Sequence, residues 1–589
     1  MKRKIPRLNL AGSATVLALL TILASAPLKA VTWLGLDPNV AVGPARSNLY
    51  GMNLNFAMRP EKVTNKEYQE GLAYLNAPLI RYHAAESIFA GHEASWINAA
   101  TQSWDASRIN TSLSNLSYPV SGKLIAIAEW PSWMDTNGDG RLDPDKFQAY
   151  AEFCADLVSI VNLQQGHGVV YWEPFNELEG RYANDVATLA QIFNLCATAM
   201  KSRDPSIKIV GAAWTQPWAP SYPGTFKEFI GLVKANLDVC SYHQYGTGDG
   251  SLSPAAIYNT IPALLEGATA VRGYLDHHGL QNVPLWLTEH NIFWSWESDY
   301  QFRMTQITGG VFDALLLTQF TRQGILDAAF SWIDADTRYG KIGFNWNSWT
   351  YDQLNPGAHV YHYFNRFAVG QVVQSSPSQG SVQTFATKDP SRNLLSLVLI
   401  NRSGENQLIY LGNSTAYNWE TLYQITESGV QTSTLNSLAW RTLPPHSVSF
   451  AIGGLGSQPT TTGGGSITLQ AEAANQTSAS VQIASNDVFI PWNGGSSAWI
   501  DFSNLQIPAN AQYDLTIRYA SFWGGMNVDV QVGGQTIGTF NQLPQTWDAN
   551  GFRQETLSNI SLPSGNNQTL RLLIQNGEIR IDYLELKQK

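Results

Sequence analysis

The sequence predicts a multidomain protein in which a (β/α)₈ TIM barrel precedes two β-sandwiches. Three observations support this prediction. The chain has 589 residues, more than one hydrophobic core usually supports. From residue 49, apolar strand-like runs alternate with amphipathic helical stretches, as in the βα units of a parallel sheet. After residue 370 the pattern changes to short alternating runs between Gly, Ser and Asn turns, which indicates all-β units.

Eight strand-like runs define the predicted barrel, which spans residues 45–369. The runs cover 49–56, 78–83, 124–130, 169–177, 207–214, 238–245, 284–291 and 328–334. Helical patterns lie between them or follow the last run, for example at 145–163, 184–202, 254–277, 302–322 and 356–368. In such a barrel the active site lies at the C-terminal ends of the strands.

Two further domains follow the predicted barrel. Residues 370–453 read as a small accessory β-sandwich that packs on the barrel. The Gly-, Ser- and Thr-rich segment 454–466 cannot be buried and is predicted to be a flexible linker. Residues 467–589 are again rich in strands, which predicts a separate, tethered β-sandwich (jelly-roll) module.

The first 30 residues have the layout of a secretory signal peptide. Basic residues precede an apolar stretch around Ala14–Ala26, and small residues follow it. Pro27 disfavours cleavage after Ala26, which favours a site near Ala30; an uncleaved anchor is the alternative. We therefore expect a secreted, periplasmic or cell-surface protein with no membrane segment after signal removal, because no later stretch reads as transmembrane.

Composition excludes some classes of partner. The net charge is −10, and removal of residues 1–30 with their five basic side chains would leave −15, so nucleic acid is not expected as a partner. No protein partner is implied. The three cysteines, Cys154, Cys196 and Cys240, are too few for a disulfide framework. Cys154 and Cys196 fall on successive predicted helices and could form a disulfide, but the favoured interpretation is that all three are small buried side chains.

Two strand-like segments end in carboxylates. They are Val-Tyr-Trp-Glu-Pro-Phe-Asn-Glu at 170–177 and Pro-Leu-Trp-Leu-Thr-Glu-His-Asn at 284–291. Both would place a glutamate, Glu177 or Glu289, at the active-site end of the barrel. Two such carboxylates are what hydrolysis of a glycosidic bond requires, one to protonate the leaving oxygen and one to attack or stabilise the anomeric carbon.

Further polar and aromatic residues gather at the predicted strand ends, where a packed barrel would otherwise present branched apolar side chains. The candidates for substrate binding are Arg81, His83, Trp130, Asn176, Trp214, His243, Tyr245 and Trp332. His243 and Tyr245 alternate along one strand, so both can point into one pocket. Flat aromatic rings stack on the C–H faces of sugars, although several of the tryptophans must belong to the core.

These strand-end residues resemble those of the retaining glycoside hydrolases of clan A. Within the clan, the Tyr-Trp-Glu-Pro-Phe-Asn-Glu string and the ending Leu443-Pro-Pro-His-Ser-Val-Ser-Phe look most similar to family 39 and its relatives, over roughly residues 45–453. The sequence departs from the usual Asn-Glu-Pro, because Leu178 follows Glu177.

The resemblance implies that Glu177 is the acid/base, Glu289 the nucleophile and Asn176 a hydrogen-bond partner of the sugar 2-hydroxyl. The acid must stay protonated near neutrality, whereas donors such as Arg81 and Tyr245 would keep the nucleophile ionised. In the alternative reading, these carboxylates only pair with arginines at strand ends. Glu173 is interpreted as a buried structural carboxylate, and the weaker rivals are Glu129, Glu179 and Glu297.

The segment 135–143 resembles the first part of a calcium-binding loop. It places oxygen ligands at loop positions one, three, five and nine, namely Asp135, Asn137, Asp139 and Asp143, with glycine at position six. Position twelve, usually a bidentate Glu, is Lys146. The alternative is an Asn-Gly/Asp-Gly turn leading into the next helix.

The C-terminal domain resembles family 6 carbohydrate-binding modules over 467–589. The resemblance rests on Leu469-Gln-Ala-Glu472, Trp499-Ile-Asp-Phe, Arg518-Tyr-Ala-Ser and Ile581-Asp-Tyr-Leu-Glu-Leu586. It implies a structural calcium site made by Gln470, Glu472 and Asp582, and a sugar-stacking Trp547, with Trp492 and Trp523 as weaker candidates. Arg580 stands where the family often has Asn, and Asn576 is a candidate substitute.

Together these features predict a secreted retaining β-glycoside hydrolase that acts on a polysaccharide or oligosaccharide by double displacement. No cofactor is expected for catalysis. Two other functions fit the same residues: a catalytically silent carbohydrate-binding protein, and a transglycosidase that uses the same covalent step.

Overall fold

The computed structural model describes most of residues 31–589. The residues outside the description are 1–30, 84, 117, 219–223, 346–347, 349, 377–379, 412–416, 436–437, 439, 456–465, 472–475, 479–480, 484–487, 491–496, 508–510, 547–551, 563–564 and 576. The predicted signal peptide and most of the predicted linker fall on these residues. The chain divides into two compact units, Met1–Gly456 and Ser457–Lys589.

A closed barrel of eight parallel strands forms the centre of the first unit, as predicted. Its strands pair in the order β10-β11-β2-β3-β6-β7-β8-β9. They are β2 (Gly51–Leu54), β3 (Leu79–His83), β6 (Gly122–Ala126), β7 (Tyr171–Glu173), β8 (Lys208–Thr215), β9 (Val239–His243), β10 (Leu285–His290) and β11 (Ala328–Ser331). Each strand lies within or next to one of the eight predicted runs, because an apolar run bounded by turns is a strong signal for a buried parallel strand.

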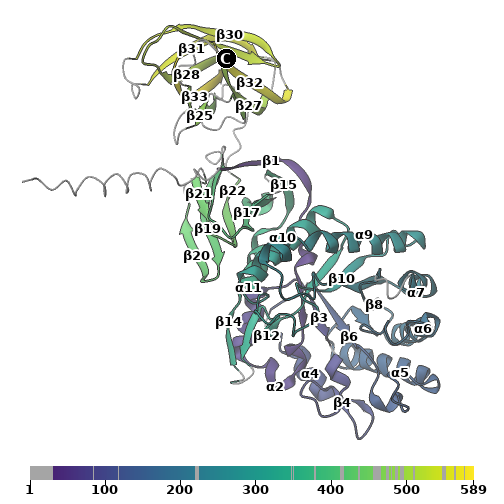
Figure 1. Cartoon of the computed structure of the whole chain (residues 1–589). Helices are drawn as coiled ribbons and strands as arrows, with labels where there is room; N and C mark the ends of the chain where they lie inside the picture. The colour runs from purple at the N-terminus through teal and green to yellow at the C-terminus, as the bar shows by residue number, and fades with distance from the viewer. Residues whose placement is uncertain are drawn as a thin grey trace, which may run out of the picture. The chain divides into compact units, whose positions relative to one another are not determined.

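Helices cover the outside of the barrel (Figure 1). They are α2 (Pro60–Val63), α3 (Lys66–Leu75), α4 (Ala106–Ser114), α5 (Phe147–Val158), α6 (Val186–Arg203), α7 (Thr225–Val233), α8 (Pro254–Tyr258), α9 (Ile261–His277), α10 (Ile307–Gln323) and α11 (Pro356–Phe367). Side chains of Asn65, Asp105 and Asp185 accept hydrogen bonds from the first-turn N–H groups of α3, α4 and α6, and so cap these helices.

Two elements of the structure differ from their predicted form. The predicted helix 254–277 is two helices, α8 and α9, because Pro262 has no N–H to continue the hydrogen-bond ladder and instead occupies the first turn of α9. The predicted strand 169–177 contains only the short strand β7, so Glu177 lies in the loop after it rather than on the strand.

An accessory sheet packs on the barrel. It contains β1 (Thr32–Pro44), β15 (Gln371–Ser376), β16 (Val382–Asp389), β17 (Leu394–Asn401), β18 (Gln407–Leu411), β19 (Asn418–Thr426), β20 (Gly429–Thr434), β21 (Trp440–Leu443) and β22 (Ser447–Gly454). Phe385, Val398 and Phe450 belong to the same buried cluster as the barrel helices. The sequence did not assign β1 to this sheet, because its antiparallel pairing with β15 and parallel pairing with β18 join segments more than 300 residues apart.

The second unit consists of two antiparallel sheets with a core of its own. One sheet contains β23 (Ser466–Gln470), β25 (Gln482–Ile483), β26 (Val488–Ile490), β28 (Ala511–Ala520), β31 (Arg553–Leu562) and β33 (Ile579–Gln588). The other contains β24 (Gln476–Thr477), β27 (Ala498–Ile507), β29 (Met526–Val532), β30 (Gln535–Leu543) and β32 (Gly565–Ile574). Alternate residues of the strands, such as Leu515, Ile517 and Tyr519, are buried, as expected for a sandwich.

The remaining short strands lie in barrel loops. They are β4 (Ile97–Asn98), β5 (Ser103–Trp104), β12 (Ala335–Asp336), β13 (Ile342–Asn345) and β14 (Thr350–Leu354). All three cysteines are buried and unpaired, which agrees with the favoured interpretation. In the described part of the chain, no helix is long and apolar enough to cross a membrane.

A buried ion pair ties the loop after β11 to α10. Lys341 Nζ lies 2.5 Å from Asp313 Oδ2, and both side chains are 1% exposed. Replacing Lys341 by Met should lower the free energy of unfolding by about 3–5 kcal/mol, because the carboxylate loses its buried partner. Thermal melting of the full-length variant would measure this loss. The double variant Asp313→Leu/Lys341→Met should recover most of it, and a single variant as stable as wild type would contradict the prediction.

Candidate active site

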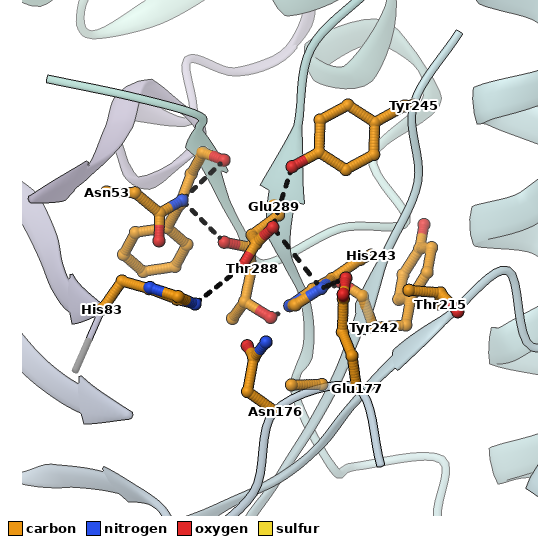
Figure 2. A network of polar contacts seen from close by, with 12 residues as sticks. Asn53, His83, Asn176, Glu177, Thr215, Tyr242, His243, Tyr245, Thr288 and Glu289 are labelled. Atoms are coloured by element: carbon orange, nitrogen blue, oxygen red, sulfur yellow. Dashed lines mark hydrogen bonds and ion pairs between the residues drawn. The ribbon is translucent and has the colours of Figure 1, made fainter. Parts of the chain in front are cut away.

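The carboxyl ends of the barrel strands bring seven polar side chains into one network; Figure 2 labels the members other than Arg81. Strands β2, β3, β9 and β10 contribute residues directly, and the segments after β7 and β9 contribute the others. The seven are Asn53, Arg81, His83, Asn176, Glu177, His243 and Glu289, and Tyr245 joins them through Glu289. The predicted polar candidates therefore meet at the end of the barrel where chemistry is expected.

Arg81 is the centre of this network and is fully buried. Its Nε donates to Glu173 Oε2 at 2.8 Å, and its Nη2 donates to Asn176 Oδ1 at 2.6 Å. Its Nη1 donates to Asn53 Oδ1 and to Glu289 Oε1, both at 2.9 Å. Burial alone would lower the pKa of Arg81, but Glu173 and Glu289 together raise it, so the guanidinium stays charged. One cation thus fixes the positions of two carboxylates and two amides.

Both carboxylate oxygens of Glu289 accept hydrogen bonds. Oε1 accepts from Arg81, and Oε2 accepts from the Tyr245 hydroxyl at 2.8 Å. His83 Nε2 lies 3.6 Å from Oε1, and His243 Nδ1 lies 3.7 Å from Oε2. Burial raises the pKa of Glu289 and the charge of Glu177 adds to this rise, while Arg81 and Tyr245 act in the opposite direction. The expected donors Arg81 and Tyr245 are therefore both in contact with this carboxylate.

Glu177 projects from a loop into the same space. Its backbone has φ 56°, in the left-handed region that is uncommon for residues with a side chain, and its N–H donates to Ala213 O at 3.1 Å. Its Oε1 lies 2.7 Å from His243 Nδ1. The side chain is 36% exposed, so it is open to a ligand at the mouth of the barrel. Burial of the carboxyl group nevertheless raises its pKa to about 7, despite the opposing charge of Arg81.

The two carboxylates face each other at short range. One oxygen of Glu177, one of Glu289 and a ring nitrogen of His243 all lie within 4.8 Å of one another. Burial lowers the pKa of His243 to about 4, so the imidazole between them is neutral. Among the described residues this trio is the only cluster of three such groups that could hold a metal ion, but Arg81 on the same carboxylate disfavours a second cation there.

The other acidic candidates have partners of their own. Glu173 is fully buried and bonded to Arg81 and to the Ser241 hydroxyl, as expected of a structural carboxylate. Glu179 accepts from the backbone and side chain of Thr215, and burial raises its pKa to about 7. Glu129 pairs with Arg181. Glu297 is exposed and bonded to Ser295.

Two predicted sugar-stacking tryptophans belong to the core instead. Trp130 is 4% exposed and lies edge-on against Tyr150 and Tyr182. Trp214 is 2% exposed and packs on Phe226 and Phe229. This burial corrects both assignments: Trp214 lies near the end of β8 and Trp130 lies four residues beyond β6, and both rings pack against helix residues. Trp332 is half-buried and packs edge-on against His83, with ring centroids 4.7 Å apart, so it stays beside the polar network.

Asn53 was missed by the sequence analysis. It lies on the fully buried strand β2, and its amide donates to Thr288 O at 2.8 Å while its oxygen accepts from Arg81. An asparagine inside an otherwise apolar strand was the available signal, since a buried amide needs partners. Ser241, which donates to Glu173, was missed in the same way.

The loop 135–143 uses its oxygens as hydrogen-bond acceptors. Asp135 accepts from the N–H groups of Gly138 and Gly140, at 2.9 and 3.0 Å, and Asn137 accepts from Asp139 N at 2.8 Å. Asp143 accepts from the backbone and hydroxyl of Thr136, which hold its pKa below the usual range. Such hydrogen bonds are expected for the alternative interpretation of this segment, an Asn-Gly/Asp-Gly turn. Calcium binding here stays a prediction.

Most of the predicted module sites fall outside the described residues. This holds for Trp547, Trp492, Glu472 and Asn576, and for the side chain of Gln470. Asp582 forms an ion pair with Arg518, so a cation already lies beside its carboxylate. Trp523 is 63% exposed and lies edge-on against Phe522, which leaves its ring open to solvent.

Comparison with known protein families supports both halves of this description. Residues 169–319 match the profile of glycosyl hydrolases family 39, and residues 470–588 match that of carbohydrate binding module family 6. The first match contains Asn176, Glu177, His243, Tyr245 and Glu289. No curated protein matches the chain.

Solved structures share the fold at low sequence identity. An α-L-arabinofuranosidase from Thermotoga maritima has 15% identity and a TM-score of 0.52, covering 71% of this chain and 99% of its own. CelM2, a bifunctional glucanase-xylanase from a metagenome library, has 17% identity and a TM-score of 0.51, covering 72% and 99%. BuGH86wt, solved in complex with neoagarooctaose, has 11% identity and a TM-score of 0.52, covering 94% and 98%.

The barrel, the paired strand-end carboxylates and the two family matches agree with one another. The protein is a glycoside hydrolase whose barrel is similar to glycosyl hydrolases family 39 over residues 169–319 and whose C-terminal domain is similar to carbohydrate binding module family 6 over residues 470–588.

Proposed function

We propose that the protein is a secreted retaining β-glycoside hydrolase that cleaves a polysaccharide by double displacement. The observation that carries the proposal is the short approach of Glu177 to Glu289, with oxygens within 4.8 Å. Retaining enzymes hold their carboxyl groups about 5–5.5 Å apart, whereas inverting enzymes need roughly 6.5–9.5 Å to admit a water molecule between them.

Glu289 is the nucleophile in this proposal. Its Oε2 or Oε1 attacks the anomeric carbon, and the bond to the leaving oxygen breaks as the glycosyl–enzyme ester forms. Arg81 and Tyr245 fix the carboxylate and favour its ionised form, and this ionised form is the one that attacks.

Glu177 is the acid/base. A carboxyl group with a pKa of about 7 is partly protonated at neutrality, so it can deliver its proton to the leaving oxygen. The resulting carboxylate then takes a proton from water as the water oxygen attacks the ester, which releases the sugar and restores both glutamates. Asn176, whose orientation is fixed by Arg81, is proposed to bond the sugar 2-hydroxyl.

The C-terminal module is proposed to hold the enzyme on its polysaccharide, which raises the local substrate concentration without new catalytic contacts. Among the residues that the structure describes, Trp523 is a candidate for this contact because its ring is exposed. Secretion by the segment 1–30 and calcium binding by the loop 135–143 or by the module belong to the same proposal and follow from the sequence.

Stereochemistry at the anomeric carbon tests the mechanism. The full-length enzyme should release products whose first-formed anomer is β, observed by proton NMR before mutarotation on a panel of soluble β-linked oligosaccharides. Initial release of the α anomer would contradict double displacement. An added acceptor sugar that captures most of the product would indicate a transglycosidase instead.

A further inference from the structure

An exposed aromatic surface follows the strand that carries Glu289. Four exposed rings lie in the segment 294–302, which we name the aromatic loop. They are Trp294 (57% exposed), Trp296 (38%), Tyr300 (56%) and Phe302 (42%). Large apolar side chains gathered in water mark a binding surface more often than a structural one. These rings are not among the proposed catalytic residues, although they lie within the region that matches family 39.

Glycines of a neighbouring loop support two of these rings from behind. A Cβ atom at Gly248 would lie 2.1 Å from the Trp294 ring, so the indole rests directly on this backbone. A Cβ atom at Gly250 would lie 1.9 Å from Ser298 O and 2.8 Å from the Tyr300 ring. With their inner sides packed on a backbone, Trp294 and Tyr300 are held in place while more than half of each side chain stays open.

Hydrogen bonds clamp the two loops together. Thr247 N donates to Ile292 O at 2.8 Å, and Trp294 N donates to Thr247 O at 3.3 Å. Ser298 Oγ donates to Gly248 O at 2.8 Å. The aromatic loop is therefore a fixed surface whose rings need little ordering when a ligand binds, which favours affinity.

The aromatic loop lies on the active-site face of the barrel. It begins four residues after β10 ends, and the loop that supports it leaves the end of β9 directly after Tyr245, which donates to Glu289. Arg338, from the segment after β12, stacks on Trp296 with its guanidinium carbon 3.7 Å from the ring centroid. The loops after three neighbouring barrel strands therefore build this surface on the face of the barrel that carries the proposed nucleophile.

Charge limits what can bind there. Asp249 and Glu297 are exposed on the two clamped loops. Two cations lie close to these rings. Arg338 stacks on the Trp296 ring and donates to Trp296 O at 2.8 Å, and Arg303, which is 9% exposed, donates to Gln301 Oε1 at 2.7 Å. A ligand with many carboxylates or sulfates would be repelled, whereas an uncharged sugar chain presents C–H faces that suit flat rings.

We propose that the aromatic loop binds sugar units of a linear, uncharged polysaccharide beyond the scissile bond, so that the enzyme cleaves within chains. This inference rests on the proposed function of Glu177 and Glu289 and names the substrate class of that site. Contacts remote from the scissile bond improve turnover of long substrates without touching the reacting atoms. An open surface, unlike a closed pocket, lets the chain continue past it.

The variants Trp294→Ala and Gly248→Ala test the loop in the full-length enzyme. Both should lower kcat/KM about tenfold on soluble neutral polysaccharides such as xylan, β-glucan or mannan, since one stacking ring contributes about that factor. Both should leave kcat/KM unchanged on aryl β-monoglycosides, which do not reach the loop. Wild type should reduce polymer viscosity early and leave pectate and alginate intact. The control Trp33→Ala removes an exposed ring of β1 and should change neither activity.

Several outcomes would overturn the inference. Equal losses on polymer and aryl glycoside would make the ring a mere support for the loops, and no loss on polymer would remove it from substrate binding. Preferred cleavage of an anionic polymer would contradict the charge argument. Titration calorimetry of neutral oligosaccharides into wild type and Trp294→Ala decides the loop's role even without turnover, because lower affinity in the variant supports it and equal affinity does not. Inactivity of wild type on every substrate would instead contradict the proposed catalytic function.

Discussion

Replacing Glu289 by Gln should lower kcat on the order of 10⁵-fold or more, because the group that forms the covalent bond is lost. The amide is nearly isosteric: its oxygen can still accept from Arg81, and its NH2 group can donate to the Tyr245 hydroxyl oxygen, so the fold should be kept. The measurement is turnover of the best substrate of the panel, with thermal melting as the check on folding. The exposed Glu266→Gln on α9 is the matched control and should keep full activity.

Covalent trapping distinguishes a nucleophile from a carboxylate that only organises the site. A 2-deoxy-2-fluoro glycoside with a good leaving group should inactivate the wild-type enzyme, and peptide mass spectrometry should place the added sugar on Glu289. No adduct should form in Glu289→Gln. A label on Glu177 or Glu179 would assign the attack to another residue and contradict the mechanism.

Replacing Glu177 by Ala should lower kcat/KM by about 10²–10⁴-fold on substrates with poor leaving groups, and much less on dinitrophenyl glycosides, whose departure needs no proton. Azide should restore turnover by attacking the glycosyl–enzyme, forming a carbon–nitrogen bond as the ester to Glu289 breaks. The expected product is a β-glycosyl azide. An α-glycosyl azide, or the same loss on all leaving groups, would contradict the acid/base role.

The dependence of activity on pH is a second test of Glu177 as the acid/base. Because the pKa of Glu177 is raised to about 7, its acid form is present below that pH and is lost above it. The kcat/KM of wild type should therefore fall above pH 7, and this alkaline limb should disappear in Glu177→Ala. Glu179 also has a pKa near 7, so Glu179→Gln is a sharp control. An alkaline limb that moves with Glu179 instead would give it the catalytic proton.

The eight strands and the proposed pair of glutamates could be predicted from the sequence, because apolar runs bounded by turns determine parallel strands locally. Their order around the barrel follows from short right-handed βα connections. Placing β1 required the tertiary structure, since its partners β15 and β18 are distant in the chain. The division of the helix 254–277 was within reach of the sequence, as Pro262 marks it.

The direction in which a side chain points could not be predicted from the sequence either. Trp130 and Trp214 end predicted strands, yet their rings pack on Tyr150 and Phe226, while Trp294 stays exposed on a loop. The strand pattern does not distinguish these cases. Trp130 lies four residues beyond β6, and the pairing of β8 with β9 shifts register between Gly211 and Trp214, so neither residue follows the regular alternation of faces. Asn53 is the opposite case: the sequence of its strand predicts a core position, yet its side chain accepts a hydrogen bond from Arg81 in the polar network.

By itself the sequence determined which residues can perform the chemistry and which strand ends carry them, because residue type and local periodicity are properties of short segments. Only the tertiary structure decided how Arg81 links Glu173, Asn53, Asn176 and Glu289, how close Glu177 comes to Glu289, and which tryptophans face solvent. Distances, burial and the pKa values that follow from them depend on packing between segments hundreds of residues apart, and that packing is a property of the folded chain as a whole.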